Sequence, residues 1–354
     1  MYEALTLGAT WFICRKLNEA GVSKRVLWRA GICMFLWLIL GFAAGFDFMM
    51  AEYDIFPYHV AEIIRAIDMN VIIITLYGFM AFFGVSLLTL FRPFTKRKAL
   101  CAFILMVCVT VYSMFEAYYV QPKYATIHTT KLPEGTERLR VVLLTDVHIG
   151  GISTLAHLER VMKIADEASP DILMLGGDIF DGDLSVRPRE LALLKEAASK
   201  ARYGAFAVNG NHEHYIILDV DPEGTFRECG YDLLINERRE TAGITVIGLE
   251  DVKYGWIRPY LEPEDAERFV LILKHRPGIP NDAEGRFDLM LSGHTHGGQF
   301  WPLGYFKDMA LHSTQGLSQK AGGWVYVSNG AGFNRAMMRL FVPPEVTVID
   351  IVRE

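Results

Sequence analysis

The chain has 354 residues, which is enough for two domains with a sizeable hydrophobic core. Its formal net charge of −6 and isoelectric point near 6.0 exclude the bulk basicity of a nucleic-acid-binding protein, so no nucleic-acid partner is expected. The five cysteines contain no C-x-x-C pair, and they predict neither a disulfide framework nor a redox compartment.

Apolar residues are concentrated in the first third of the chain. Three continuous apolar runs occur at about 30–50, 71–91 and 99–120. A helix rises about 1.5 Å per residue, so each run is long enough to cross a hydrocarbon layer of about 30 Å. We therefore predict a membrane domain over residues 1–122 with three spans. Residues 2–14 are a possible fourth span or an interfacial helix, without a signal-peptide cleavage pattern.

Charge in the short loops predicts the orientation of these spans. Basic residues precede the first span and separate the second from the third, whereas the other loop is mainly acidic. The basic residues are Arg15, Lys16, Lys24, Arg25 and Arg29 in the first segment and Arg92, Lys96, Arg97 and Lys98 in the second. Because basic loops stay in the cytoplasm, we expect a multi-pass protein of the bacterial inner membrane whose remaining chain lies on the outer side.

The rest of the chain has the pattern of a globular α/β domain. A polar connector over residues 123–138 precedes a domain over residues 139–354. Early strands are predicted at 139–145, 171–175 and 205–208, with helices at 155–168 and 191–201 between them. Later strands are predicted at 245–249, 270–273, 289–292, 324–328 and 346–352. This alternation predicts α/β layers with at least one parallel sheet.

Polar clusters follow five of these predicted strands. They are Asp146-Val-His148, Gly177-Asp178-Ile-Phe-Asp181, Gly210-Asn211-His212-Glu213, Lys274-His275 and Gly293-His294-Thr-His296. Ligands of such sheets bind beyond the carboxyl ends of the strands, so these clusters should meet at one rim. Carboxylate, imidazole and amide groups without a thiolate favour Mn, Fe or Zn ions over a closed cysteine zinc site.

Two such cations about 3.5–4 Å apart can clamp the oxygens of a phosphate during in-line attack. Asp178 lies on the middle strand, and its two carboxylate oxygens make it the natural bridging ligand. The histidines outside these clusters lack such a context, and we expect them to be structural. They are His59, His128, His157, His214 and His312.

Together, the five clusters resemble the calcineurin-like metallophosphoesterase superfamily. The stretch from Ser292 to Gln299 and the sequence Pro343-Pro344-Glu345 are similar to the bacterial membrane-associated branch typified by YkuE and YaeI. The resemblance covers roughly residues 124–354. It implies a two-sheet β-sandwich flanked by helices, following the N-terminal transmembrane helices.

The resemblance also implies roles for individual residues. One metal, with manganese favoured, would be held by Asp146, His148, Asp178 and His296, and a second by Asp178, Asn211, His275 and His294. His212 would protonate the leaving oxygen or stabilise charge on the phosphate, and Asp181 would orient His212.

Two further groups are candidates for substrate contact. Arg335 and Arg339 could supply phosphate-binding charge, or they could be surface arginines on a strand connection. The aromatic residues Phe300, Trp301, Tyr305 and Phe306 could form an apolar lip for a lipid-linked substrate, or they could pack in the core.

The sequence thus predicts a membrane-anchored dinuclear phosphoesterase, in which metal-bound hydroxide attacks a phosphodiester or pyrophosphate bond of a lipid or envelope intermediate. A phosphatase for soluble phosphomonoesters or nucleotides is the alternative enzyme. A membrane scaffold with a slow or vestigial metal site is the alternative from another class.

Overall fold

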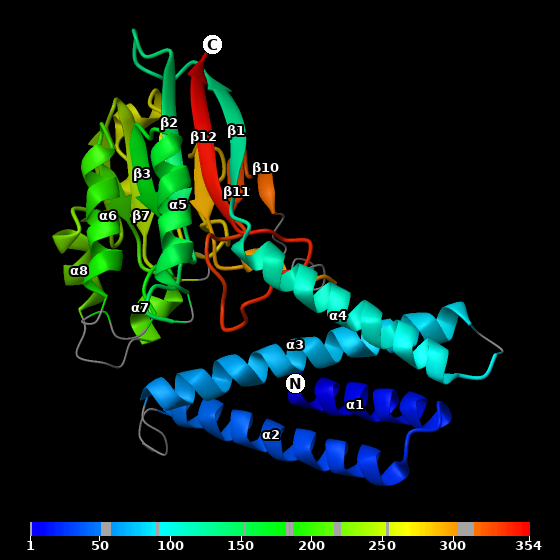
Figure 1. Cartoon of the computed structure of the whole chain (residues 1–354). Helices are drawn as coiled ribbons and strands as arrows, with labels where there is room; N and C mark the ends of the chain where they lie inside the picture. The colour runs from blue at the N-terminus through cyan, green and yellow to red at the C-terminus, as the bar shows by residue number, and fades with distance from the viewer. Residues whose placement is uncertain are drawn as a thin grey trace. The chain divides into compact units, whose positions relative to one another are not determined.

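A computed structural model describes residues 2–50, 58–89, 92–151, 153–181, 184, 187–215, 221–252, 255–302 and 315–354. The chain forms two compact units (Figure 1). A helical unit comprises Met1–Phe115 together with Arg335–Met338, and a globular unit comprises Glu116–Asn334 together with Arg339–Glu354.

The helical unit contains α1 (Tyr2–Glu19), α2 (Lys24–Met50), α3 (Tyr58–Leu88) and most of α4 (Lys96–Tyr118). Within the described residues, three segments are long and apolar enough to cross a membrane: Lys24–Ala44, Ile63–Leu88 and Lys96–Tyr118. Large apolar side chains such as Trp28 and Phe103 are exposed on them, as a lipid environment requires. The expectation of three apolar N-terminal helices is confirmed, and α1 is not among these segments.

A buried carboxylate lies where α2 and α3 pack against each other. Asp68 of α3 is only 7% exposed and faces Gly41 of α2. A Cβ atom on Gly41 would stand 2.2 Å from the Asp68 carboxyl carbon, so an alanine there would force the buried carboxyl group of Asp68 to shift.

The globular unit is a sandwich of two six-stranded sheets, as the resemblance implied. The first sheet has the order β1-β12-β2-β3-β4-β5, with β1 (Gln121–Thr129), β12 (Glu345–Arg353), β2 (Arg138–Leu144), β3 (Ile172–Leu175), β4 (Ala205–Ala207) and β5 (Asp232–Leu233). The second has the order β10-β11-β9-β8-β7-β6, with β10 (Gly316–Lys320), β11 (Gly323–Val327), β9 (Leu289–Ser292), β8 (Val270–Lys274), β7 (Ile244–Leu249) and β6 (Glu237–Thr241).

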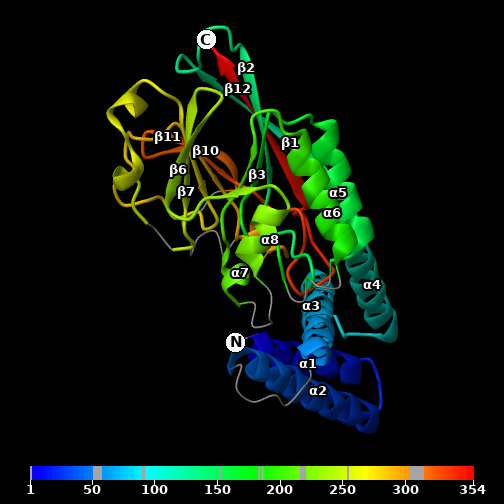
Figure 2. The same ribbon diagram turned by 90° about the vertical axis from the view of Figure 1, so that its left-hand side faces the viewer.

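Helices cover the outer face of the first sheet (Figures 1 and 2). These are α5 (Leu155–Glu167), α6 (Pro188–Lys200) and α8 (Pro222–Glu228), and the short α7 (Asn211–Tyr215) follows β4. The predicted helix α5 is confirmed: its Thr154 side chain caps it by accepting a hydrogen bond from the His157 N–H group. Short 3₁₀ turns occupy Arg258–Tyr260, Pro263–Ala266 and His296–Gly298.

The main core lies between the two sheets, where the strands are buried on both faces. Leu143 and Met174 of the first sheet belong to the same buried cluster as Leu271 and Leu291 of the second. This burial explains why the strand sequences are apolar throughout rather than alternating. Strands β2, β3 and β4 are parallel to one another, as are β7, β8 and β9, so each set directs its carboxyl ends to one edge of its sheet.

Candidate metal centre

The predicted ligands converge at the carboxyl ends of β2, β3, β4, β8 and β9. The structure contains three groups of residues that could bind a metal ion. Within each group, the potential ligand atoms all lie within 4.8 Å of one another. The groups are Asp146, His148 and His296; His148, Asp178 and His212; and Asp178, His275 and His294. The two outer groups are joined by the middle one, which shares His148 with the first and Asp178 with the last.

Distances in the first group fit a shared cation. The Nε2 atoms of His148 and His296 are 3.1 Å apart, and Nε2 of His296 is 3.2 Å from Oδ1 of Asp146. Nitrogen ligands bound at about 2.0–2.1 Å from one metal stand about 2.8–3.4 Å apart, from octahedral to tetrahedral geometry. The spacing therefore matches three ligands around one ion.

The second group shows the same spacing and a defined histidine tautomer. Nε2 of His275 is 3.2 Å from Oδ2 of Asp178 and 3.2 Å from Nδ1 of His294. The other ring nitrogen of His275, Nδ1, lies 2.8 Å from the Gly176 carbonyl and donates to it. That hydrogen bond keeps the lone pair on Nε2, the atom facing the group, as in metal-ligating histidines.

Asn211 provides a test of whether a metal fits here. The residue is 8% exposed, and its Oδ1 atom is buried without a hydrogen-bond partner in the described part of the chain. A buried acceptor without a partner costs about 1–3 kcal/mol. A bound cation would satisfy such an oxygen, and the role of Asn211 as a ligand of the second ion stays a prediction.

The electrostatics of the rim also favour cations. Burial raises the pKa of Asp146, and the neighbouring Asp178 raises it further. Burial alone would lower the pKa of His275, but the charges of Asp178 and Asp146 raise it to about 10. Two buried carboxylates therefore attract positive charge strongly, whether it is carried by protons or by metal ions.

The backbone of the rim is strained at the predicted ligands. Positive φ values occur at Asp146 (55°), His148 (56°), Asp178 (52°), His294 (69°) and His296 (50°). Such values are uncommon for residues other than glycine, and clusters of them are typical of functional sites. Backbone hydrogen bonds hold the conformation, including those from the His148 N–H group to Asp178 and from the Asp146 N–H group to Gly177.

Glu213 is a residue whose role the sequence analysis missed. Its buried carboxylate accepts four backbone hydrogen bonds, from the N–H groups of Asp178, Ile179, Phe180 and Gly210, over 2.7–2.9 Å. Burial raises the pKa of Glu213, whereas the donated N–H groups favour its charged form. Glu213 thereby holds the turn that carries Asp178, and its place in the third cluster was the only signal for this.

Asp181 lies between two histidines. Its Oδ1 atom is 3.1 Å from Nδ1 of His212, and its Oδ2 atom is 3.5 Å from Nδ1 of His148. Although burial opposes ionisation of Asp181, its interactions with His148 and His212 lower its pKa. Burial opposes protonation of His212 as well, but the contact with Asp181 raises the pKa of His212 above its ordinary value. Asp181 therefore contacts both the predicted acid and a predicted metal ligand.

The two candidate arginines are placed differently. Arg335 is exposed and belongs to the helical unit. Arg339 is fully buried in the globular unit, where its guanidinium donates to the carbonyls of Gly332 and Asn329 and lies 3.5 Å from Nδ1 of His296. Burial lowers the pKa of Arg339 to about 10. This arrangement directs the Arg339 guanidinium to backbone carbonyls and to the ring of His296, and contact of Arg339 with a phosphate group stays a prediction.

The remaining predicted residues are placed as follows. Trp301 is 50% exposed, whereas Tyr305, Phe306 and His312 lie outside the described residues. His157 is buried with Nε2 2.7 Å from the Ala331 carbonyl, in keeping with a structural role.

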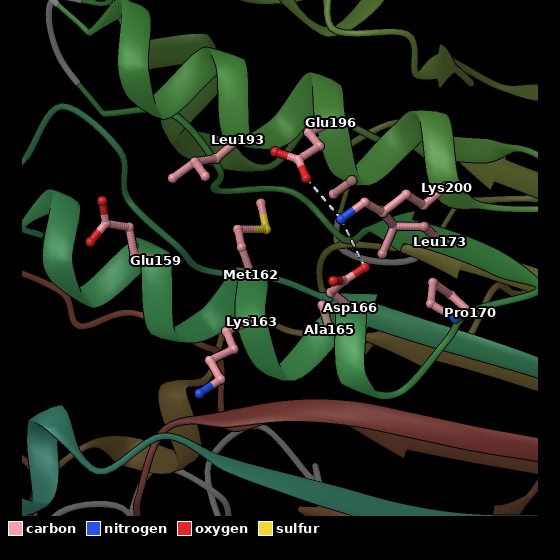
Figure 3. Close-up of a pocket in the computed structure, with 11 residues that line it drawn as sticks. Glu159, Met162, Lys163, Ala165, Asp166, Pro170, Leu173, Leu193, Glu196 and Lys200 are labelled. Carbon is pink, nitrogen blue, oxygen red and sulfur yellow. Dashed lines mark ion pairs between the residues drawn. The ribbon is translucent and has the colours of Figure 1, made fainter.

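A separate cavity of about 280 Å³ lies between α5 and α6 (Figure 3). Lys200 extends along it and pairs with Asp166 at 3.0 Å and with Glu196 at 2.8 Å. The lining residues are Glu159, Met162, Lys163, Ala165, Asp166, Pro170, Leu173, Leu193, Glu196, Ala197 and Lys200. Since none of the predicted site residues lines it, this cavity is distinct from the metal centre.

Comparison with known proteins identifies the family. A model of the calcineurin-like phosphoesterase family matches residues 139–298. A metallophosphoesterase of Aquifex aeolicus is 33% identical over 256 residues, covering 69% of this chain and 97% of the relative. YkuE of Bacillus subtilis is 26% identical over 253 residues, covering 67% and 87%, respectively.

A zebrafish (Danio rerio) protein described as a transmembrane protein with a metallophosphoesterase domain is 29% identical over 283 residues. The match covers 72% of this chain and 62% of that relative, so the chain spans almost all of the Aquifex protein but only part of the zebrafish one. The apolar helices and this relative support association with a membrane. The chain belongs to the calcineurin-like metallophosphoesterase family and is a metal-dependent hydrolase of phosphate esters.

Proposed function

We propose that this protein is a membrane-anchored phosphoesterase that uses two divalent ions to hydrolyse phosphodiester or pyrophosphate bonds, with a lipid or envelope intermediate as substrate. The observation that carries the proposal is the chain of three ligand groups joined through His148 and Asp178. A single-metal site would not need a further ligand group joined to the first through shared residues.

Each ion has a set of residues suited to hold it. Asp146, His148, Asp178 and His296 would hold one, and Asp178, Asn211, His275 and His294 the other. When bound, the ions would polarise phosphate oxygens and activate a water molecule. Oxygen and imidazole ligands suit Mn, Fe or Zn ions, and we favour manganese.

The residues of the chain itself supply proton transfer and orientation. Asp181 contacts Nδ1 of His212, and Nε2 of His212 lies 3.9 Å from Oδ2 of Asp178. His212 therefore presents its second nitrogen toward the carboxylate that the two ligand sets share. From there it can donate a proton to the leaving oxygen or stabilise charge on the phosphate, while Asp181 fixes the ring.

Substitution of His212 by alanine tests this role. His212→Ala should lose most turnover while retaining both metals, because His212 is outside the proposed ligand sets. His214→Ala is the matched control, since His214 is two residues away, 45% exposed at its side chain and paired with Glu250 at 3.0 Å. Full activity in His212→Ala, or loss of both metals with it, would contradict the mechanism.

The substrate class is argued from the anchor. A soluble substrate gives no reason for a hydrolase to carry three apolar helices, whereas a lipid-linked ester is confined to the same surface. Manganese-loaded protein should be assayed on extracted phospholipids beside generic soluble monoesters and diesters. Activity restricted to soluble monoesters would favour the soluble-substrate phosphatase, and metal binding without any turnover would favour the scaffold.

We infer that the membrane part is multi-pass with the catalytic unit on the outer side of a bacterial inner membrane. The inference is supported by basic residues at Arg15–Arg29 and Arg92–Lys98, flanking candidate spans. A reporter fused after Glu354 should be active outside the cytoplasm. A signal confined to the cytoplasm would reverse the orientation.

A further inference from the structure

Two large aromatic side chains form an exposed pair on the globular unit. Trp301 is 50% exposed and Phe341 is 63% exposed, and their ring centroids are 6.1 Å apart in an edge-to-face arrangement. Exposed apolar surface of this kind commonly marks an interaction site. Tryptophan and other aromatic rings are also the side chains enriched at the boundary between lipid and water.

The pair is connected to the end of helix α4. The backbone N–H group of Phe341 donates to Oε2 of Glu116 over 2.7 Å, and Glu116 is buried in the last turn of α4. The Tyr118 ring packs edge-to-face against Phe333 at 5.6 Å, adding a second contact between the helix end and the same loop. The third candidate span ends at Tyr118. These contacts therefore hold the loop that contains Phe333 and Phe341 against the end of α4, where the chain is expected to leave the membrane.

The pair is also connected to the metal centre. The Trp301 N–H group donates to the Leu340 carbonyl, and the Leu340 N–H group donates to the Gln299 carbonyl. Arg339, two residues before Phe341, contacts the ring of the predicted ligand His296. A short hydrogen-bonded segment therefore joins the exposed rings to the rim.

The backbone at Phe341 is unusual for an exposed position. Its φ is 59°, in the left-handed region that bulky residues rarely adopt and that glycine or asparagine would occupy more readily. The hydrogen bond to Glu116 helps to hold it there.

We propose that the Trp301–Phe341 pair inserts into the interfacial layer of the membrane that holds α4, where it forms a lip over which a lipid-borne phosphate ester reaches the metal centre. The occupant is a lipid surface rather than a protein, because the pair is continuous with the helix end through Glu116 and Tyr118. This inference rests on the proposed function, since it takes α4 as a membrane anchor and a lipid ester as the substrate.

Fluorescence quenching tests the contact directly. The full chain is reconstituted into vesicles of phosphatidylcholine and phosphatidylglycerol whose acyl chains are either unmodified or brominated close to the headgroup. The emission of Trp301 is obtained by subtracting the spectrum of Trp301→Phe from that of the wild type. We expect this emission to be blue-shifted and to lose most of its intensity in the brominated vesicles.

Trp324 is the matched control. It begins β11, which runs parallel to β9, so it lies at the opposite end of the second sheet from the metal centre. The emission removed by Trp324→Phe should be equal in both kinds of vesicle. Equal emission of Trp301 in both kinds of vesicle would overturn the proposal, with or without a blue shift, because a ring that lies among the acyl chains must be quenched by bromine.

The readout is separate from catalysis. Trp301→Phe keeps an aromatic ring, and its bound metal content reports whether the rim is intact; Trp301→Tyr provides the same subtraction if that variant does not fold. Absence of quenching together with His212-dependent hydrolysis of phospholipid would reject the lip but retain the proposed function. Quenching without any hydrolysis of lipid esters would support the membrane contact and reject the proposed substrate.

Discussion

Replacement of Glu213 by glutamine is expected to release the turn that positions Asp178 and thereby to empty the metal centre. Each carboxylate oxygen of Glu213 accepts two backbone N–H groups: Oε2 from Asp178 and Gly210, and Oε1 from Ile179 and Phe180. Glutamine has nearly the same shape but offers one oxygen and one NH₂ donor. Whichever way the amide points, two buried N–H groups face a donor instead of an acceptor.

The magnitude follows from those two lost bonds. A buried N–H group without an acceptor costs about 1–3 kcal/mol, so Glu213→Gln should destabilise the globular unit by about 2–6 kcal/mol. For a domain of this size, 1 kcal/mol corresponds to about 2–4 °C in melting temperature, so a decrease of roughly 5–20 °C is expected. The φ of 52° at Asp178 should also relax, which would move a ligand predicted for both ions.

Two measurements in parallel check this prediction: metal per protein by plasma mass spectrometry and thermal unfolding of the purified protein. Glu228→Gln is the matched control, because Glu228 is exposed at the end of α8 and the charge change is identical. The control should lie within about 0.5 kcal/mol of the wild type. If Glu213→Gln kept its full metal content and melted with the control, the assigned role of Glu213 would be refuted.

Three other perturbations have defined outcomes. Gly41→Ala should lower the thermal stability of the helical unit because its Cβ would meet Asp68 at 2.2 Å, whereas Gly84→Ala, with no atom within 4 Å of its Cβ, should not. Burial lowers the pKa of His157 to about 4, below the ordinary 6.5. The free energy of unfolding should therefore keep its full value above pH 6.5 and fall by about 3 kcal/mol as the pH drops toward 4, because folding holds the His157 ring neutral. Urea titrations at a series of pH values should show a weaker pH dependence in His157→Gln. Removal of metal by a chelator should lower the melting temperature and added manganese should restore it, since an ion that binds only the folded state stabilises it; equal melting with and without metal would contradict the site.

Local patterns were sufficient for much of the fold and of the candidate site. The apolar helices were evident from run length, and strands such as β2 and β3 were evident because both of their faces are buried. The candidate ligands could be named in advance because aspartate, asparagine and histidine after buried strands have few other uses. The common rim followed from the rule that ligands lie beyond the carboxyl ends of parallel strands.

Tertiary contacts decided the remaining roles. Glu213 and Arg339 are ordinary charged residues in the sequence, and their roles arise from backbone groups brought to them by folding. The exposed Trp301–Phe341 pair likewise depends on residues far apart in the chain, as does the bond from Phe341 to Glu116.

The sequence by itself thus determined the family, the helices suited to a membrane and the chemical identity of the candidate ligands, because hydrophobic periodicity and ligand type are local properties. Only the tertiary structure decided which charges are buried, which backbone groups they satisfy and which aromatic rings remain exposed. Those properties depend on long-range packing: the burial of Arg339 and its contact with His296 cannot be read from the residues beside it in the sequence.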